Sequence, residues 1–319
     1  MIGGRVMPDS GTYRKKTLFR DRVKKQRYVL IMMAPAFILT FIFCYLPLTG
    51  WVMAFTDYKI GKSLFSGKFT GFLQFQHFLA GSKDFIYLIR NTLVINVSSV
   101  IINIFLAVVF AVLLNEIHHS RYKKTVQTIT FFPFFISWVI TYSVVWALFA
   151  VRSGSINQLL ISLGIVKKGF NFLGDPNYSW GLMIVLNMWK YLGYNSIIFL
   201  AGISGISLEE YEAAAIDGAS RFQRVMKITL PNLIPTASIL LIMNSGWVFN
   251  SNLEQFFIFT NPTNQDKMQV LDMYIYTYGL KLTDYSYATA VGILKTAVSI
   301  LTLWLVNRAT RKLSDSAIF

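Results

Sequence analysis

A glycine-lysine-serine run is the part of this 319-residue sequence that most resembles a nucleotide-binding motif. Ile60-Gly61-Lys62-Ser63 ends as a phosphate-binding loop does, but Thr56 stands where such a loop needs its first glycine. That glycine lets backbone N–H groups close around the phosphates, and no helix is expected to open here after a strand. We therefore predict that ATP is not bound here and that any ATP chemistry belongs to another chain.

Metal ligands and nucleophiles are also scattered. His77 stands alone, and His118 and His119 are adjacent, so they point to different faces of a helix. Cys44 is the single cysteine, which excludes an intrachain disulfide, and it has no partners at the spacing of a zinc site. We predict no metal site and no catalytic residues, which argues against an integral membrane enzyme.

One long apolar run carries polar and aromatic side chains at helical spacing. They fall on one stripe: Asn187, Lys190, Tyr191 and Tyr194. Amide, ammonium and phenol groups suit a water-filled path for a sugar, and a charge inside a membrane span usually faces a cavity or a partner. The alternative is that these groups bond to one another across helix interfaces.

The elements that must position this stripe are membrane spans. Hydrophobic residues make up 54% of the chain and charged residues only 14%, against about a quarter charged in soluble domains. Six apolar runs are each long enough for a tilted spanning helix, and aromatic residues gather near several of their ends. The runs are 29–56, 87–114, 126–150, 180–204, 233–257 and 286–307. We predict an all-α membrane protein with six transmembrane helices.

Basic residues orient these spans. Residues 1–27 hold nine Lys or Arg against two Asp, which places the N-terminus in the cytoplasm, and six crossings return the C-terminus there. The net charge of +15 is explained by these flanking residues in contact with membrane lipid, and not by nucleic acid. The predicted segments are the basic N-terminus 1–27, a six-helix transmembrane domain 28–312 and a cytoplasmic tail 313–319.

A charged amphipathic loop, 205–231, separates the fourth and fifth runs. Ser207 is expected to cap a helix and to form a capping box with Glu210. Gly218 suits the end of that helix. Ser220 is expected to cap a second short helix, which Pro231 closes.

This loop resembles the EAA loop of binding-protein-dependent ABC importer permeases. Glu212-Ala213-Ala214, three residues, Gly218, nine residues, Ile228, one residue and Leu230-Pro231 match every fixed position of that pattern. The resemblance implies a type I importer permease fold and a coupling helix that docks on an ATPase subunit. Its expected contact residues are Glu210, Tyr211, Glu212, Ala213, Ala214, Ala215, Asp217, Gly218 and Phe222.

The resemblance also implies partners: a second permease subunit, two ABC ATPase subunits that carry ATP and Mg, and an external solute-binding protein. Transport would proceed by alternating access across the cytoplasmic membrane. The overall texture is similar to the oligosaccharide branch, which includes maltose and LplB-type importers and importers of uronate polysaccharides such as alginate. The runner-up is an ion-coupled secondary transporter or channel using Lys190, Lys295 and Glu254, for which inverted repeats would be expected.

Overall fold

The computed structural model describes residues 24–81 and 84–311, and these residues are largely helical. The predicted tail 313–319 lies outside the described residues, as does the predicted basic segment 1–27 except for its last four residues. The first span and its connection are α2 (Arg27–Thr40), η1 (Phe41–Tyr45), η2 (Leu46–Phe55), β1 (Thr56–Asp57), β2 (Lys68–Phe69), α3 (Leu73–Gln76) and η3 (His77–Gly81). The strands β1 and β2 pair antiparallel as a short hairpin.

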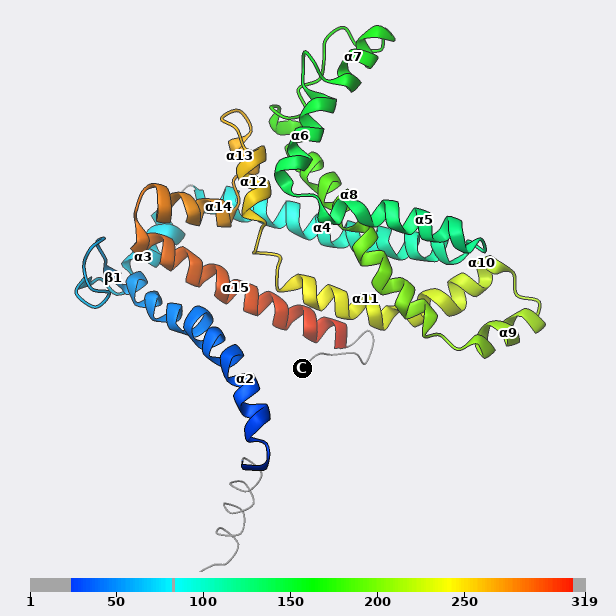
Figure 1. The fold of residues 1–319 in the computed structure, drawn as a ribbon. Helices are drawn as coiled ribbons and strands as arrows, with labels where there is room; N and C mark the ends of the chain where they lie inside the picture. The colour runs from blue at the N-terminus through cyan, green and yellow to red at the C-terminus, as the bar shows by residue number, and fades with distance from the viewer. Residues whose placement is uncertain (1–23, 82–83, 312–319) are drawn as a thin grey trace, which may run out of the picture.

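The rest of the chain follows in order (Figure 1). Its first part comprises α4 (Asp84–Asn115), α5 (Ser120–Phe131), η4 (Phe132–Phe135), α6 (Trp138–Phe149), α7 (Ser155–Ser162) and α8 (Pro176–Ser204). Next come α9 (Leu208–Ile216), α10 (Arg221–Arg224), η5 (Val225–Thr229) and α11 (Leu230–Ser245). The last part comprises α12 (Leu253–Phe259), α13 (Gln265–Met268), α14 (Leu271–Tyr276), η6 (Thr277–Lys281) and α15 (Tyr285–Arg311).

Within the described residues, four continuous helical stretches are long and apolar enough to cross a membrane: Arg27–Phe55, Asp84–Asn115, Arg221–Ser245 and Tyr285–Arg311. Two more candidate spans are bent pairs. The stretch from α5 through η4 meets α6 at 106°, and α8 meets α9 at 69°. If each bent pair counts as one span, the total reaches the six that the sequence predicts.

Two predicted runs differ from the structure. The run 126–150 is not one helix, because η4 contains Pro133 and the backbone at Ile136 is extended. The predicted end of a helix at Pro231 is wrong, because Arg221–Ser245 is helical throughout. A π-helical turn, η5, precedes Pro231. Its hydrogen bonds join residues five apart, and this wider turn accommodates the ring of Pro231, which has no N–H to donate. The fifth span consequently begins within the charged loop 205–231 and ends at Ser245, well short of the predicted 257.

The centre of the bundle is the pair α4 and α8, which pack along much of their length, with α11 and α15 beside them. One core cluster joins Ala107 and Ala111 of α4 to Phe199 of α8 and Leu240 of α11. Small residues on α4 let the helix backbones approach closely, which is how helices associate in a membrane. This arrangement fixes the faces of α4 and α8 relative to each other.

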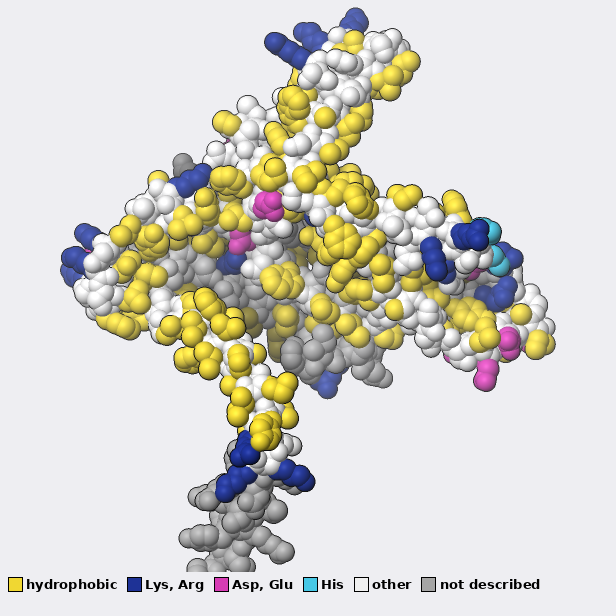
Figure 2. Space-filling model, viewed as in Figure 1, with side chains coloured by type: hydrophobic (Ala, Val, Ile, Leu, Met, Phe, Trp, Pro, Cys, Tyr) yellow, Lys and Arg dark blue, Asp and Glu magenta, His cyan; other side chains and the backbone are white. Residues whose placement is uncertain are grey.

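The first span is the least packed part of the described chain. No residue of α2 is buried, and hydrophobic side chains cover its surface (Figure 2). Only its far end is anchored, where Ala54 of η2 packs with Phe75 and Ala290. A helix that is apolar on all sides needs lipid or another apolar surface around it.

Candidate functional site

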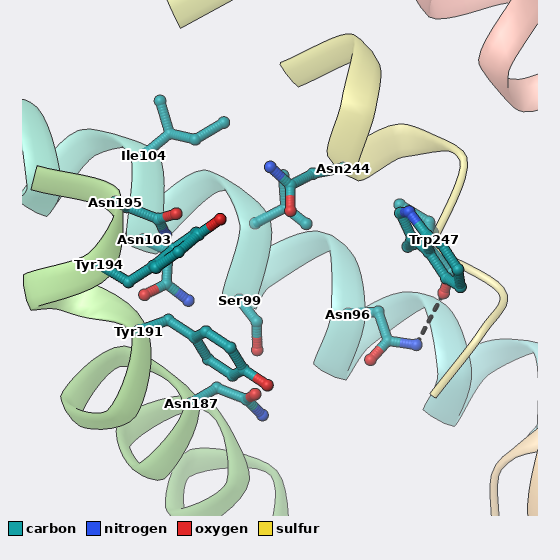
Figure 3. A pocket seen from close by; sticks show the side chains of 12 residues that line it. Asn96, Ser99, Asn103, Ile104, Asn187, Tyr191, Tyr194, Asn195, Asn244 and Trp247 are labelled. Carbon is teal, nitrogen blue, oxygen red and sulfur yellow. Dashed lines mark hydrogen bonds between the residues drawn. The ribbon is translucent and has the colours of Figure 1, made fainter. Parts of the chain in front are cut away.

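A polar cavity of about 230 Å³ lies between α4, α8 and the end of α11 (Figure 3). Its walls are formed by Asn96, Ser99, Val100, Asn103, Ile104, Asn187, Tyr191, Tyr194, Asn195, Asn244, Trp247 and Val248. Among these described lining residues none is charged, and amides dominate. The cavity therefore offers donors and acceptors without a fixed charge.

Two side chains on α4 have unused hydrogen-bonding capacity. Ser99 Oγ and Asn103 Oδ1 are buried, and neither has a hydrogen-bond partner among the described residues. Both residues line the cavity. The two oxygen atoms themselves are not accessible from the cavity, so a solute there would contact other atoms of these residues.

Aromatic rings form another part of the wall. Tyr194 stacks on Phe134 of η4 with ring centroids 4.6 Å apart and an interplanar angle of 10°. Tyr191 meets the same ring edge-on at 5.8 Å. Such pairs contribute roughly 0.5–1.5 kcal/mol beyond their burial, so Phe134 fixes the orientation of both tyrosines.

A second cavity of about 360 Å³ continues from the first. It shares Tyr194, Asn195, Asn244 and Trp247 with the first cavity, and then follows α8 and α11 as far as Thr236. Apart from Thr236, the residues that only the second cavity has are aliphatic: Ile198, Ile239, Leu240 and Met243. The polar and aromatic lining therefore belongs to the first cavity and to the residues that both cavities share.

Of the four residues predicted for a path, the structure brings three together. Asn187, Tyr191 and Tyr194 line the first cavity, but Lys190 does not. Lys190 is 5% exposed and donates to the carbonyl oxygens of Pro133, at 3.3 Å, and of Ile136. The four residues have the spacing of one helix face, but the Lys190 side chain points to the neighbouring span that contains Pro133 and Ile136.

Sequence reasoning missed the α4 wall of the cavity. Asn96, Ser99 and Asn103 follow one another at intervals of three and four residues, which places them on one face of a helix. That spacing inside an apolar run was the available signal.

The three groups of the ion-path alternative have separate environments. Lys295 Nζ lies 2.5 Å from Asp272 Oδ1, an ion pair between α15 and α14. Glu254 is exposed in the first turn of α12, and Lys190 binds the carbonyls described above. These groups do not combine into one route.

The charged loop 205–231 has the predicted helix, turn and helix. Ser207 caps α9 by accepting a hydrogen bond from the Glu209 N–H at 3.2 Å. The predicted capping box with Glu210 is not the arrangement found, because the Glu210 carboxylate accepts a hydrogen bond from Asn232 Nδ2 at 3.1 Å. Gly218 has φ of +75°, a conformation that favours glycine.

The second short helix begins as predicted. Ser220 caps α10, and its full capping box includes Gln223. Tyr211 turns toward the bundle, and its hydroxyl lies 2.9 Å from Thr229 Oγ1. The other predicted contact residues that are exposed are Glu210, Glu212, Ala213, Ala215, Asp217, Gly218 and Phe222, while Ala214 is half-buried.

Two large apolar side chains stand out on the loop's surface. Ile216 is 87% exposed and Phe222 is 73% exposed, and they flank the Gly218 turn. Ile216 was absent from the predicted contact set. Exposed apolar residues beside a sharp turn are suited to insertion into a groove of another protein.

Comparison with known proteins identifies the family. Residues 103–315 match the family described as "Binding-protein-dependent transport system inner membrane component". The chain belongs to this family. It is a membrane-spanning permease subunit of an ABC importer, the non-catalytic membrane component, as the loop sequence predicts.

The similarity to individual relatives extends over nearly the whole permease. The polygalacturonan/rhamnogalacturonan transport system permease protein YteP of Bacillus subtilis is 34% identical over 313 residues, 98% of this chain and 97% of YteP. Protein LplB of Bacillus subtilis is 33% identical over 297 residues, which cover 93% of this chain and 92% of LplB. Family membership decides against the ion-coupled alternative.

Solved structures agree. A chain in the crystal structure of a bacterial ABC transporter that imports the acidic polysaccharide alginate matches with a TM-score of 0.84 and 32% identity, covering 93% of this permease and 99% of that chain. A chain of the bacterial alginate transporter in complex with an alginate pentasaccharide-bound periplasmic protein matches with a TM-score of 0.85 and 31% identity, at the same coverage. The predicted importer permease fold is thereby confirmed.

Proposed function

We propose that this permease carries a sugar or oligosaccharide through the cavity between α4, α8 and α11. The observation that carries the proposal is the wall of this cavity, where asparagine side chains stand beside the aromatic rings of Tyr191, Tyr194 and Trp247. Hydroxyl groups of a sugar form hydrogen bonds with amides, and pyranose rings stack on aromatic faces. Relatives named for polygalacturonan, rhamnogalacturonan and alginate transport support this class of cargo.

The route is assigned to three predicted residues, Asn187, Tyr191 and Tyr194, together with the α4 wall. Lys190 is left out of the route because its ammonium group is bound to the carbonyls of Pro133 and Ile136. The uncharged lining suits a neutral saccharide, and relatives named for lactose and arabinooligosaccharide transport support this class of cargo. An acidic saccharide would need positively charged contacts from another subunit.

Coupling to ATP is assigned to α9 and the turn after it. The exposed surface of this segment includes Glu212, Ile216 and Phe222. It would enter a groove on an ABC ATPase subunit, which is the subunit that binds ATP and Mg. Movement of α9 reaches the bundle through the Tyr211–Thr229 and Glu210–Asn232 hydrogen bonds. Closure of the ATPase dimer would therefore shift the balance between two packings of the spans, which is alternating access.

The remaining partners follow from this orientation. We assign the loop 205–231 and both termini to the cytoplasm. The helix α7 and the segment from α12 to η6 are assigned to the outer face, where a solute-binding protein would dock. A second permease subunit would complete the cavity, since Trp247 is exposed at its edge. Together these assignments describe a subunit of the cytoplasmic membrane.

The route is tested with the assembled importer in proteoliposomes. Ser99→Ala and Asn103→Leu each make the α4 wall of the cavity less polar, and a lost hydrogen bond to the solute is worth about 0.5–1.5 kcal/mol, so uptake kcat/KM for the transported saccharide should fall roughly two- to tenfold. Labelled galacturonan and alginate oligosaccharides and lactose serve as probes. Ser143→Ala, on an exposed face of α6, is the matched control and should transport normally.

The coupling surface is tested in the same preparation. Glu212→Lys and Gly218→Val should weaken ATPase-subunit co-purification or uncouple hydrolysis from uptake, while the six spans still insert. Valine at φ of +75° costs on the order of 1–2 kcal/mol and redirects the second helix. Unchanged uptake for both cavity variants would refute the route, and unchanged co-purification and coupling for both loop variants would refute the coupling surface.

A further inference from the structure

Lys190 lies beside the sharp break in the third span, not in the cavity. We propose that Lys190 is a positioning residue that fixes the angle between α5 and α6 and, through η4, holds the aromatic wall of the cavity. The link to transport rests on the proposed function of that cavity. The positioning role itself rests on the contacts that follow.

The break leaves backbone groups that need partners. η4 contains Pro133, Ile136 is extended with φ of −75° and ψ of 132°, and Ser137 caps α6 by accepting a hydrogen bond from the Ile140 N–H at 3.3 Å. The Pro133 carbonyl accepts the Ile136 N–H at 3.2 Å, whereas the Ile136 carbonyl has no backbone donor among the described residues. In an apolar environment such a carbonyl must find a donor elsewhere. The α5 and α6 helices leave this junction in different directions (Figure 1).

The ammonium group of Lys190 supplies that donor. It bonds the carbonyl of Pro133 inside η4 and the carbonyl of Ile136 just before α6, so one group ties the two sides of the break. It also lies 5.1 Å from the ring centroid of Trp138, the first residue of α6. An ammonium has three donors and no acceptor, and it favours the negative C-terminal end of a helix dipole.

A glycine lets α8 reach this position. A Cβ added to Gly193 would lie 2.3 Å from the Thr130 carbonyl oxygen and 2.6 Å from Phe131 Cα. Because Gly193 is three residues after Lys190, both lie on the face of α8 that contacts the end of α5. Close approach and carbonyl binding are therefore parts of one contact.

The same contact determines the cavity wall. Phe134 sits inside η4, between the two carbonyls that Lys190 binds, and stacks on Tyr194 at 4.6 Å. Tyr194 belongs to the lining of both cavities. If η4 were free to move, Phe134 and Tyr194 would lose their fixed orientation.

The experiment measures the angle of the break directly. Spin labels at Thr125 on α5 and Val144 on α6, both exposed, report the distance across the break by pulsed electron resonance in nanodiscs, in an importer carrying Cys44→Ala. Lys190→Met should shift the main distance peak by more than its wild-type width, or broaden it by a comparable amount. It should also raise the KM of uptake more than it lowers kcat, with ATPase subunits still bound.

Matched variants separate positioning from general damage. Lys190→Arg keeps the donors and should restore the narrow wild-type peak, while Lys295→Met removes a half-buried lysine of another span and should leave this distance unchanged. Lys190→Gln, which retains a donor, should give an intermediate peak and keeps the test usable if the Met variant does not assemble. A wild-type distance in Lys190→Met, or the same displacement in Lys190→Arg or Lys295→Met, would overturn the proposal.

The distance readout does not depend on the identity of the cargo. A shifted peak in Lys190→Met together with normal uptake by Ser99→Ala and Asn103→Leu would leave the positioning role intact and refute the route. An unshifted peak in Lys190→Met, together with impaired uptake by the two cavity variants, would refute the positioning role and leave the route intact.

Discussion

Lys190 and Lys295 are two lysines within membrane spans, and the protein compensates their charges in different ways. Lys190 is bound by carbonyl dipoles and by the face of Trp138. Lys295 is bound by the carboxylate of Asp272, which also accepts a hydrogen bond from the Ser251 N–H at 2.6 Å. Removing Lys190 leaves neutral carbonyls behind, whereas removing a member of the ion pair leaves a formal charge.

Both lysines lie within continuous helices, α8 and α15, and each contacts groups that support irregular backbone in a neighbouring segment. Lys190 ties the junction of α5 and α6, and the Lys295–Asp272 pair holds Ser251 in the irregular segment after α11. Asn96 of α4 supports that segment too, by donating to the Val248 carbonyl at 2.7 Å and to Ser251 Oγ at 2.9 Å. Irregular backbone within a membrane protein is thus stabilised by polar side chains from neighbouring helices, which lipid cannot replace.

The largest effect is expected at the ion pair. Asp272→Ala leaves the Lys295 ammonium and the Ser251 N–H without their acceptor, and breaking such a pair typically costs about 3–5 kcal/mol. The purified variant should show the largest fall in unfolding temperature of those considered. The double variant Asp272→Ala, Lys295→Met should regain part of that loss; if it is less stable than Asp272→Ala alone, the ion pair is not the cause.

A smaller effect is expected from Gly193→Ala, which tests the Lys190 region without touching the lysine. The added Cβ meets backbone atoms at 2.3 Å, so α8 or the end of α5 must shift, and overpacking of this kind costs about 1–3 kcal/mol. The variant should displace the Thr125–Val144 distance in the way that Lys190→Met does. Gly181→Ala, with nothing within 4 Å of the added atom, is the control; equal stability of the two variants would contradict a close approach at Gly193.

The smallest effect is expected from Trp138→Phe. Phenylalanine keeps an aromatic face under the Lys190 ammonium but weakens the attraction, by roughly 0.5–1 kcal/mol. A slight fall in unfolding temperature and a narrow distance peak are expected, while Trp138→Leu should cost more. A loss as large as that from Lys190→Met would mean that the ring, and not the carbonyls, holds the lysine.

The sequence alone determined what depends on near neighbours in the chain. Apolar run lengths predicted six spans, and residue types within the loop 205–231 predicted its two short helices, their Ser207 and Ser220 caps and the turn at Gly218. Helical periodicity placed Asn187, Tyr191 and Tyr194 on one face. These features arise from hydrogen bonds and side-chain contacts over a few residues, so local residue types decide them.

The tertiary structure alone decided which neighbour each polar group meets. Lys190 has the spacing of a cavity residue, yet its hydrogen-bond partners, Pro133 and Ile136, are more than fifty positions away in the sequence. Only the packing of α8 on the break between α5 and α6 brings them together. Glu210 binds Asn232 instead of closing a capping box, and Pro231 continues a helix because a π turn precedes it. A flexible side chain selects among acceptors that folding brings near, and helical periodicity does not contain that information.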